Sequence, residues 1–314
     1  MDKLPTTLQA AIIYFSDEDR CLQFAVTRRW PGGVCCPTCG SVEVKFIPTR
    51  RLWECKEKHP RKQFSFKAGT IFEDSALPLS KWFLAMWMLA NCKNGVSSYE
   101  IHRAIGVTQK SAWFMMHRIR LAMQTGSFQK FSGGSEADET FIGGLSKNMH
   151  PEVRERRITG TGGKDKMMVM GVLERGGKVH AKVITDRTAE VVKNEIRRTV
   201  EPGTALYTDS FRSYRGLDAE YTHEVIDHAV EYVRGNVHTN GIENFWSLLK
   251  RGLKGTYVAV EPEHLQSYVH EQVFRFNHRK DMNDGGRFNT VAAQVVGKRL
   301  TYAELTGKTG QVRP

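Results

Sequence analysis

The sequence of 314 residues has no long hydrophobic run, and this absence narrows the classes of protein to consider. Its longest apolar stretch, from Trp82 to Ala90, is far shorter than the roughly 20 residues that a membrane-spanning helix needs. The N-terminal Met1-Asp-Lys-Leu-Pro also lacks the profile of a secretory signal peptide. We therefore expect a cytoplasmic protein that does not span a membrane.

The sequence also has few cysteines for a disulfide-stabilised protein, and fewer acidic than basic residues. Six cysteines are too few for a disulfide scaffold in a chain of this length. The 34 acidic residues are outnumbered by 46 basic residues, which gives a formal net charge of +12. This surplus indicates a polyanionic partner, with nucleic acid as the first candidate and an anionic membrane surface as the second.

Four of the six cysteines lie close together, which favours metal binding over disulfides. Cys36-Pro-Thr-Cys39 and Cys55-Lys-Glu-Lys-His59 are separated by fifteen residues. Three thiolates and one imidazole at this spacing form a common ligand set for structural zinc. Cys35 competes with Cys36 for the first position, and we prefer Cys36 because it leaves two residues before Cys39.

Short strand-like runs accompany these ligands, at 42–47, 52–54 and 63–66. Ligand pairs and strands in this order are the plan of a zinc ribbon, which we assign to residues 31–70. The alternative is that the cysteines are free and buried and that His59 is an exposed turn residue.

Helical patterns flank the ribbon on both sides. Residues 1–30 contain a predicted helix over 17–30, capped by Ser16. Residues 71–125 are predicted to form a helical domain that begins with a strongly apolar helix at 81–92.

The segment 96–120 of this helical domain has the form helix, turn, helix. The turn falls at Gly106, and Thr108 caps the second helix. A DNA-binding helix-turn-helix inserts its second helix into a groove, whereas a plain helical hairpin gives much the same pattern. The predicted DNA-contacting residues of the second helix are Gln109, Lys110, Ser111 and Arg118.

After a polar, Gly-rich linker at 126–135, the period of the apolar residues changes to two, which is typical of strands. The candidate strands cover 137–141, 167–173, 178–184, 205–208 and 222–226. Gly176-Gly177 is the expected hairpin turn between the second and third strands.

Helices are expected between and after these strands, at 188–199 with Asp186 as its cap, at 210–215 and at 261–278. Three hairpin-connected strands followed by helix, strand, short helix, strand and last helix is the order of an RNase H-like α/β core. We assign this core to residues 136–280.

Two basic segments have no predicted regular structure. The segment 144–166 interrupts the first hairpin and is rich in basic residues and glycines. It is interpreted either as a mobile loop that contacts DNA or as a solvated loop without a role. Residues 281–314 are interpreted as a basic C-terminal tail.

Three acids fall where such a core would gather metal ions: Asp138 in the first strand, Asp209 at the end of the fourth, and Glu243 on a later helix. Phosphoryl transfer on DNA uses two divalent cations roughly 4 Å apart, and carboxylate oxygens suit Mg²⁺ or Mn²⁺. Burial of a carboxylate on a central strand costs free energy unless the carboxylate binds a metal ion or is paired with a cation.

Glu136 and Glu139 are the alternatives to Asp138 as the acid of the first strand. In a regular strand Glu136 shares its face and Glu139 points the other way.

Two of these acids have structural alternatives. Asp209 can be an ordinary helix cap, and Glu243 can complement the positive N-terminus of its helix. Lys250 lies two turns beyond Glu243 on the same helical stripe. Lys250 and Arg251 are predicted to contact DNA phosphates near the metal ions.

Three blocks of the sequence resemble those of bacterial insertion-sequence transposases of the DDE class, and more narrowly the Merlin-related group with an N-terminal zinc ribbon. The blocks are Asp138-Glu-Thr-Phe-Ile-Gly-Gly144, Tyr207-Thr-Asp-Ser-Phe-Arg-Ser-Tyr214 and His238-Thr-Asn-Gly-Ile-Glu-Asn-Phe-Trp-Ser-Leu-Leu-Lys250. The resemblance spans residues 20–280. It implies that Asp138, Asp209 and Glu243 are the catalytic acids and that Lys250 is the associated cation.

The resemblance also implies cofactors: two Mg²⁺ or Mn²⁺ ions at the active site and one structural Zn²⁺. In part of the group Asn replaces the third acid, and this chain keeps Glu243. The chain departs from many relatives at His59, where they place a fourth cysteine, and this puts the zinc ligand set in doubt.

The function that the resemblance implies is DNA transposition. A bacterial, cytoplasmic transposase would bind the terminal inverted repeats of double-stranded DNA, cleave the strand and join the freed 3′-OH to target DNA, as a homo-oligomer associated with the nucleoid. One alternative is a catalytically inactive or repurposed zinc-ribbon DNA-binding protein. A sequence-tolerant metal nuclease without strand transfer is the other.

Overall fold

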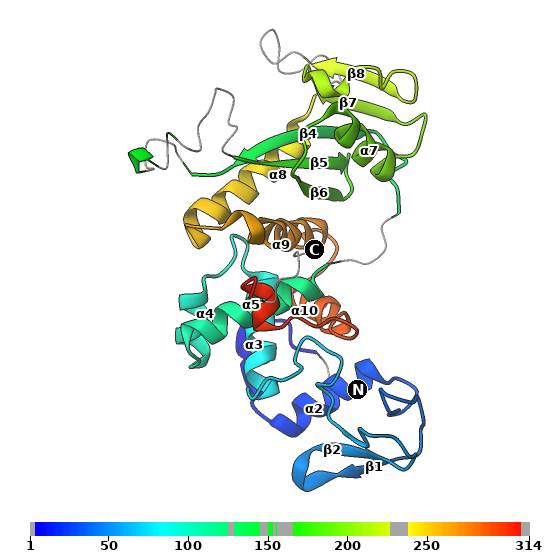
Figure 1. Ribbon diagram of the computed structural model, residues 1–314, viewed down its shortest axis with the longest axis vertical. Helices are drawn as coiled ribbons and strands as arrows, with labels where there is room; N and C mark the ends of the chain where they lie inside the picture. Colours follow the sequence, from blue (N-terminus) through cyan, green and yellow to red (C-terminus); the bar gives the residue numbers. More distant parts are fainter. Residues whose placement is uncertain are drawn as a thin grey trace. The chain divides into compact units, whose positions relative to one another are not determined.

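The computed structural model describes residues 4–124, 129–144, 150–152, 155, 166–226 and 238–308. The chain divides into two compact units (Figure 1). The first joins Met1–Gln124 to His278–Pro314, and the second is Thr125–Asn277. Among the residues that the structure describes, no helix has both the length and the apolar composition needed to cross a membrane.

The first unit is mostly helical. Its described helices are α1 (Leu8–Tyr14), α2 (Glu18–Arg29), α3 (Leu79–Asn91), α4 (Ser98–Ile105), α5 (Gln109–Ala122), α10 (Asp284–Ala293) and α11 (Tyr302–Leu305). Helix α3 is apolar on nearly all sides because neighbouring helices cover it. The rings of Phe83 and Trp87 on α3 contact Phe288 of α10, which forms the centre of this core.

The predicted helix at 17–30 is present as α2, but its cap differs from the prediction. The side chain of Asp17 accepts hydrogen bonds from the backbone N–H groups of Asp19 and Arg20. Ser16 instead donates its hydroxyl to the carbonyl of Ile13, at the end of α1. Helix α1 was not expected, and its presence explains why Ser16 is already engaged.

A basic tail was expected at 281–314, but its described part, 281–308, is not a tail. The described part, up to residue 308, folds with the first unit, where α10 packs on α3. Arg287 of α10 donates to the side chain of Asn91, and a β-bridge joins Val296 to Thr70. The basic, Gly-containing composition hid the apolar positions Phe288 and Val291, which are both buried.

The predicted ribbon strands form a small antiparallel sheet in the order β1-β2-β3. These strands are β1 (Val44–Ile47), β2 (Leu52–Cys55) and β3 (Gln63–Phe64), with a 3₁₀ turn, η1 (Pro48–Arg50), in the first hairpin. Aromatic rings cover one side of this sheet, where Trp30 from the end of α2 contacts Trp53 and Phe64.

The second unit contains a five-stranded sheet, and each of its strands lies within two residues of a predicted strand. The strands are β4 (Ser135–Ile142), β5 (Met167–Glu174), β6 (Val179–Ile184), β7 (Ala205–Asp209) and β8 (Thr222–Ile226). Their order is β6-β5-β4-β7-β8. Strands β4, β5 and β6 are antiparallel, whereas β7 pairs in parallel with β4 and β8.

Helices cover both faces of this sheet (Figure 1). Helix α7 (Ala189–Thr199) and the 3₁₀ turn η3 (Arg212–Tyr214) pack on one face. On the other face lie α8 (Asn240–Arg251), its π-helical extension η4 (Gly252–Tyr257), and α9 (Leu265–Asn277), which follows the 3₁₀ turn η5 (Pro262–His264). Alternate residues of β5 are buried on opposite faces, as expected for a central strand.

Three details of the second unit differ from the prediction. Thr188, not Asp186, is the N-cap residue of α7, and Asp186 accepts a hydrogen bond from the Thr188 N–H just before the helix. The predicted helix at 210–215 is only the short turn η3. Phe131 of the expected linker is buried in the core and hydrogen-bonds to the backbone of Thr199 and Glu201. Most of the predicted loop at 144–166 lies outside the described residues.

Candidate active site and metal centre

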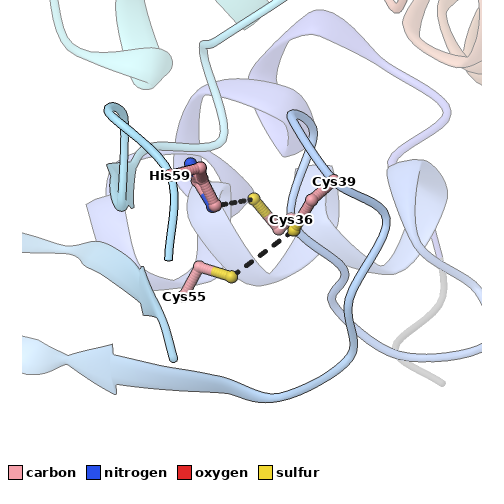
Figure 2. A group of neighbouring side chains, drawn as sticks. All are labelled: Cys36, Cys39, Cys55 and His59. Carbon is pink, nitrogen blue, oxygen red and sulfur yellow. Dashed lines mark hydrogen bonds between the residues drawn. The ribbon is translucent and has the colours of Figure 1, made fainter. Parts of the chain in front are cut away.

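The four predicted zinc ligands converge in the ribbon. Cys36, Cys39, Cys55 and His59 each offer a ligand atom, and these atoms all lie within 4.8 Å of one another. Figure 2 shows the four side chains pointing toward one another, with Cys36 Sγ 3.4 Å from His59 Nε2 and Cys39 Sγ 3.6 Å from Cys55 Sγ. Cys35 is outside this group, as predicted from the two-residue spacer.

The local backbone suits a bound cation at this group. Gly40 follows the first ligand pair with φ of 76°, a left-handed conformation that glycine adopts without strain. Burial opposes ionisation of the Cys36 thiol, but backbone N–H groups of Cys39 and Thr38 stabilise its thiolate and lower its pKa to about 7. A thiolate is the form that binds zinc, so this backbone prepares the residue for a metal ion.

A second group of possible metal ligands lies in the sheet of the second unit. Asp138, Glu139 and Asp209 bring their carboxylate oxygens within 4.8 Å of one another. Strands β4 and β7 are parallel neighbours, with Ala137 paired to Thr208, so the next residues along both strands, Asp138 and Asp209, lie side by side. This pairing is the physical basis for the meeting of two acids 71 residues apart in the sequence.

The side chains of Asp138 and Glu139 leave β4 on opposite faces, as strand alternation predicts. Asp138 Oδ2 accepts a hydrogen bond of 2.8 Å from the indole N–H of Trp246 on α8. Glu139 Oε2 accepts one of 2.7 Å from the hydroxyl of Tyr214 in η3. The carboxylate oxygens of Asp138 and Glu139 nevertheless both lie within 4.8 Å of a carboxylate oxygen of Asp209, the last residue of the adjacent strand β7. From the sequence, Glu139 is a rival of Asp138 for the metal site, whereas the structure places the two acids together.

Burial and mutual repulsion make ionisation of these acids difficult without a cation. Burial, followed by the negative charge of Asp209, raises the pKa of Asp138 to about 6. Burial raises the pKa of Glu139 to about 8, against the opposing hydrogen bond from Tyr214. A divalent cation would supply the missing positive charge, so the donor set fits a hard, oxygen-binding ion.

Glu243 is on the first turn of α8, as predicted, but it is not part of the group formed by Asp138, Glu139 and Asp209. Its Oε1 atom accepts a hydrogen bond of 3.2 Å from the hydroxyl of Thr239. Glu243 is close enough to contribute to the raised pKa of Asp138, as the smallest of the causes. Its helix therefore faces the acid group while its carboxylate is turned toward Thr239.

The two predicted phosphate-binding cations occupy the last turn of α8. Lys250 is half-buried and Arg251 is exposed. Lys250 is seven positions after Glu243, so the two residues lie two turns apart on the same side of the helix.

The predicted DNA-contacting residues of the first unit have different environments. Lys110 is exposed, with Nζ 4.6 Å from the ring centre of Tyr302. Gln109 donates to Ser98, and Ser111 is held by the capping residue Thr108. Helices α4 and α5 meet at Gly106, whose φ is 61°, so the expected turn is present.

The prediction that Arg118 contacts DNA does not agree with its position in the structure. Its side chain is 3% exposed, and it donates to the carbonyl oxygens of Leu300 and Glu73. Helical periodicity predicts which residues share a face, but the segment near Leu300 that covers this face comes from the far end of the chain. Arg118 therefore holds the first unit together and does not present its guanidinium to a partner.

A ribbon with four converging metal ligands and an α/β sheet that clusters carboxylates fit a transposase-like protein, and comparison with known proteins agrees. Residues 130–277 match the ISXO2-like transposase domain, and residues 16–59 match the transposase zinc-ribbon domain. The chain belongs to this family of transposases.

Two relatives illustrate the similarity. An uncharacterised protein in transposable element ISH50 of Halobacterium salinarum is 28% identical over 268 residues, which cover 81% of this chain and 89% of that protein. An uncharacterised transposase-like protein of Haemophilus influenzae is 36% identical over 101 residues, which cover 32% of this chain and 81% of that protein.

Proposed function

We propose that this protein is an insertion-sequence transposase that binds the terminal inverted repeats of its element, cleaves DNA and joins the freed 3′-OH to target DNA. The observation that carries the proposal is the convergence of Asp138 and Asp209 on neighbouring parallel strands. The strand order β6-β5-β4-β7-β8, with the first three strands antiparallel, supports an RNase H-like core.

Asp138 and Asp209 would hold the divalent cations, Mg²⁺ or Mn²⁺, with Glu139 as a further carboxylate beside them. When bound, two such ions activate the attacking oxygen and stabilise the leaving oxygen. Tyr214, which is fully buried, keeps the Glu139 side chain directed toward Asp209. Glu243 would complete the acidic set from α8 once its side chain turns from Thr239, and Lys250 and Arg251 would contact phosphates.

The ribbon group would hold one structural Zn²⁺ through Cys36, Cys39, Cys55 and His59. The bound ion would fix the two ligand loops, since a ribbon of this size has too few apolar contacts to do so alone. The formal charge of +12 and the exposed Lys110 at the start of α5 support DNA as the partner. A homo-oligomer would bring two transposon ends together in the bacterial cytoplasm, at the nucleoid.

Cleavage of DNA that carries the element's ends tests this function. We expect cleavage and strand transfer that require Mg²⁺ or Mn²⁺, and loss of both with Asp138→Asn or Asp209→Asn at unchanged DNA affinity. Cleavage by the Asp138→Asn protein would overturn the metal-dependent mechanism. Tight, salt-dependent binding by a wild-type protein that never cleaves would instead identify a repurposed DNA-binding protein. Cleavage without joined products would identify a nuclease.

A further inference from the structure

Helix α8 has no side-chain cap of its own. Its N-cap residue, Thr239, makes no capping hydrogen bond, although the first N–H groups of any helix lack partners within the helix. The partner comes from the sheet: Glu136 Oε2 on β4 accepts a hydrogen bond of 3.0 Å from the backbone N–H of Ile242. Glu136 is only 1% exposed, so this contact is shielded from water.

The second oxygen of Glu136 is paired with Arg175, which directly follows β5, and lies near His238, two residues before α8. Oε1 is 3.0 Å from Arg175 Nε and 3.3 Å from His238 Nδ1. Arg175 also donates to the carbonyl of His238 at 2.7 Å, and its guanidinium lies 3.7 Å from the ring centre of Tyr207. Both carboxylate oxygens therefore have partners at α8 or beside it, and Glu136 is not part of the group formed by Asp138, Glu139 and Asp209.

Two glycines allow α8 to approach the sheet this closely. A Cβ atom on Gly241 would lie 2.8 Å from Glu136 Oε2, and one on Gly171 of β5 would lie 2.7 Å from the Trp246 ring. Gly171 is paired with Asp138 across the sheet, so the Trp246 indole fits over it and donates to that acid. The helix thus contacts β4 at two points one turn apart.

We propose that Glu136 is a positioning residue that fixes α8, and with it Glu243, relative to Asp138. This inference rests on the proposed function of the acid group. Glu243 directly follows Ile242, whose N–H is bound to Glu136. Glu136 and Asp138 lie two residues apart on one face of β4. A loss of the anchor lets the first turn of α8 move, and the distance between Glu243 and Asp138 changes.

Matched variants test the effect on cleavage. Glu136→Ala removes the anchor, whereas Glu136→Gln keeps an oxygen that can accept from Ile242. Glu195→Ala is the control, because Glu195 is also a buried, ion-paired acid of this unit but lies on α7. At equal folded fraction we expect Glu136→Ala to lower kcat on the order of 100-fold, Glu136→Gln to recover much of it, and the control to stay near wild type. Equal losses in Glu136→Ala and Glu195→Ala would overturn the proposal.

Gly241→Ala provides a second variant if Glu136→Ala does not fold. Alanine favours a helix more than glycine does, yet the added Cβ collides with Glu136. We expect this variant to stay folded and to lose kcat like Glu136→Ala. Wild-type kcat in this variant would contradict the inference.

Hydrogen exchange separates this inference from the proposed function, because it needs no DNA. We expect Glu136→Ala to speed amide exchange about tenfold in the first turn of α8, with no change there in Glu195→Ala. Unchanged exchange in Glu136→Ala would overturn the anchor even if the enzyme is active. If the wild-type protein does not cleave DNA, the proposed function is wrong. The exchange result still tests whether Glu136 anchors α8.

Discussion

Trp246 donates its indole N–H to Asp138 at 2.8 Å, which joins helix α8 to the strand that carries the first acid. The indole is 4% exposed and lies above Gly171, where no side chain obstructs it. A hydrogen bond to a buried carboxylate stabilises the charged form, and the bond from Trp246 lowers the pKa of Asp138 against the effect of burial.

Replacement of Trp246 by Phe keeps most of the apolar contact and removes this donor. We expect a loss of about 1–3 kcal/mol in the free energy of unfolding and a higher Mg²⁺ concentration for half-maximal cleavage. Denaturant titration and a metal titration of cleavage measure both. Trp82→Phe is the control, because its indole donates to the neutral Ser75 hydroxyl in the first unit. An unchanged metal requirement in Trp246→Phe would contradict the role of this bond.

The zinc ligand set predicts a sharp contrast between adjacent cysteines. Cys36→Ser should lose the bound zinc and unfold the ribbon, since the free energy of metal binding is part of the folding free energy of such a site. Cys35→Ser should keep one zinc per chain, because Cys35 is outside the ligand group. Metal analysis of the purified proteins measures the zinc content. Equal zinc in both variants would show that the assignment is wrong.

Two cations of α5 should respond differently to replacement. Lys110→Ala should weaken DNA binding, reduce its salt dependence by about one ion and lower stability by at most about 1 kcal/mol, because Lys110 is exposed and the contact that it loses is with the Tyr302 ring. Arg118→Ala should instead destabilise the first unit by roughly 2–4 kcal/mol, since two backbone carbonyls lose their donor in a buried place. Binding measured over a salt series and thermal unfolding distinguish the two. An equal loss of affinity without a loss of stability in Arg118→Ala would contradict its structural role.

Glu195 makes stability depend on pH. Burial opposes its ionisation, but a hydrogen bond from His180 and the charges of Lys182 and Arg198 lower its pKa to about 2. Because this folded-state pKa is below the unfolded value, the stabilisation is fully present above about pH 4.5 and is lost as the pH falls toward 2. We expect Glu195→Gln to cost about 2–3 kcal/mol at pH 6 and roughly half of that or less at pH 3.

Urea denaturation of the wild type and Glu195→Gln at both pH values measures this difference. A variant whose cost is the same at pH 6 and pH 3 would rule out the ion pairs as its cause.

The pattern of residues predicts much of the second unit because its signals are local. Alternation of apolar residues locates all five described strands, and the expected hairpin turn falls at Gly176, whose φ is 73°. The ribbon ligands are equally local, because short spacers hold each pair of ligands in one turn. The positions of Asp138 and Asp209 follow from the same strands once these are paired in parallel.

Contacts between distant segments are beyond such patterns. Two helices without their own side-chain caps, α3 and α8, receive glutamates from elsewhere: Glu18 accepts from the N–H groups of Leu79 and Ser80, and Glu136 from that of Ile242. Helix-capping rules consider only residues next to the helix in the sequence. They therefore cannot predict a glutamate acceptor that is 61 or 106 residues away. The fold of residues 278–308 with the first unit escaped prediction for the same reason.

The sequence by itself determined the strands, the ribbon ligands and the two acids on adjacent strands, because periodicity and short spacing are properties of neighbouring residues. Only the tertiary structure decided that Glu139 joins the acids, that Glu136 anchors α8, and that Arg118 is buried. These roles depend on which surfaces pack together, and packing is set by residues far apart in the chain.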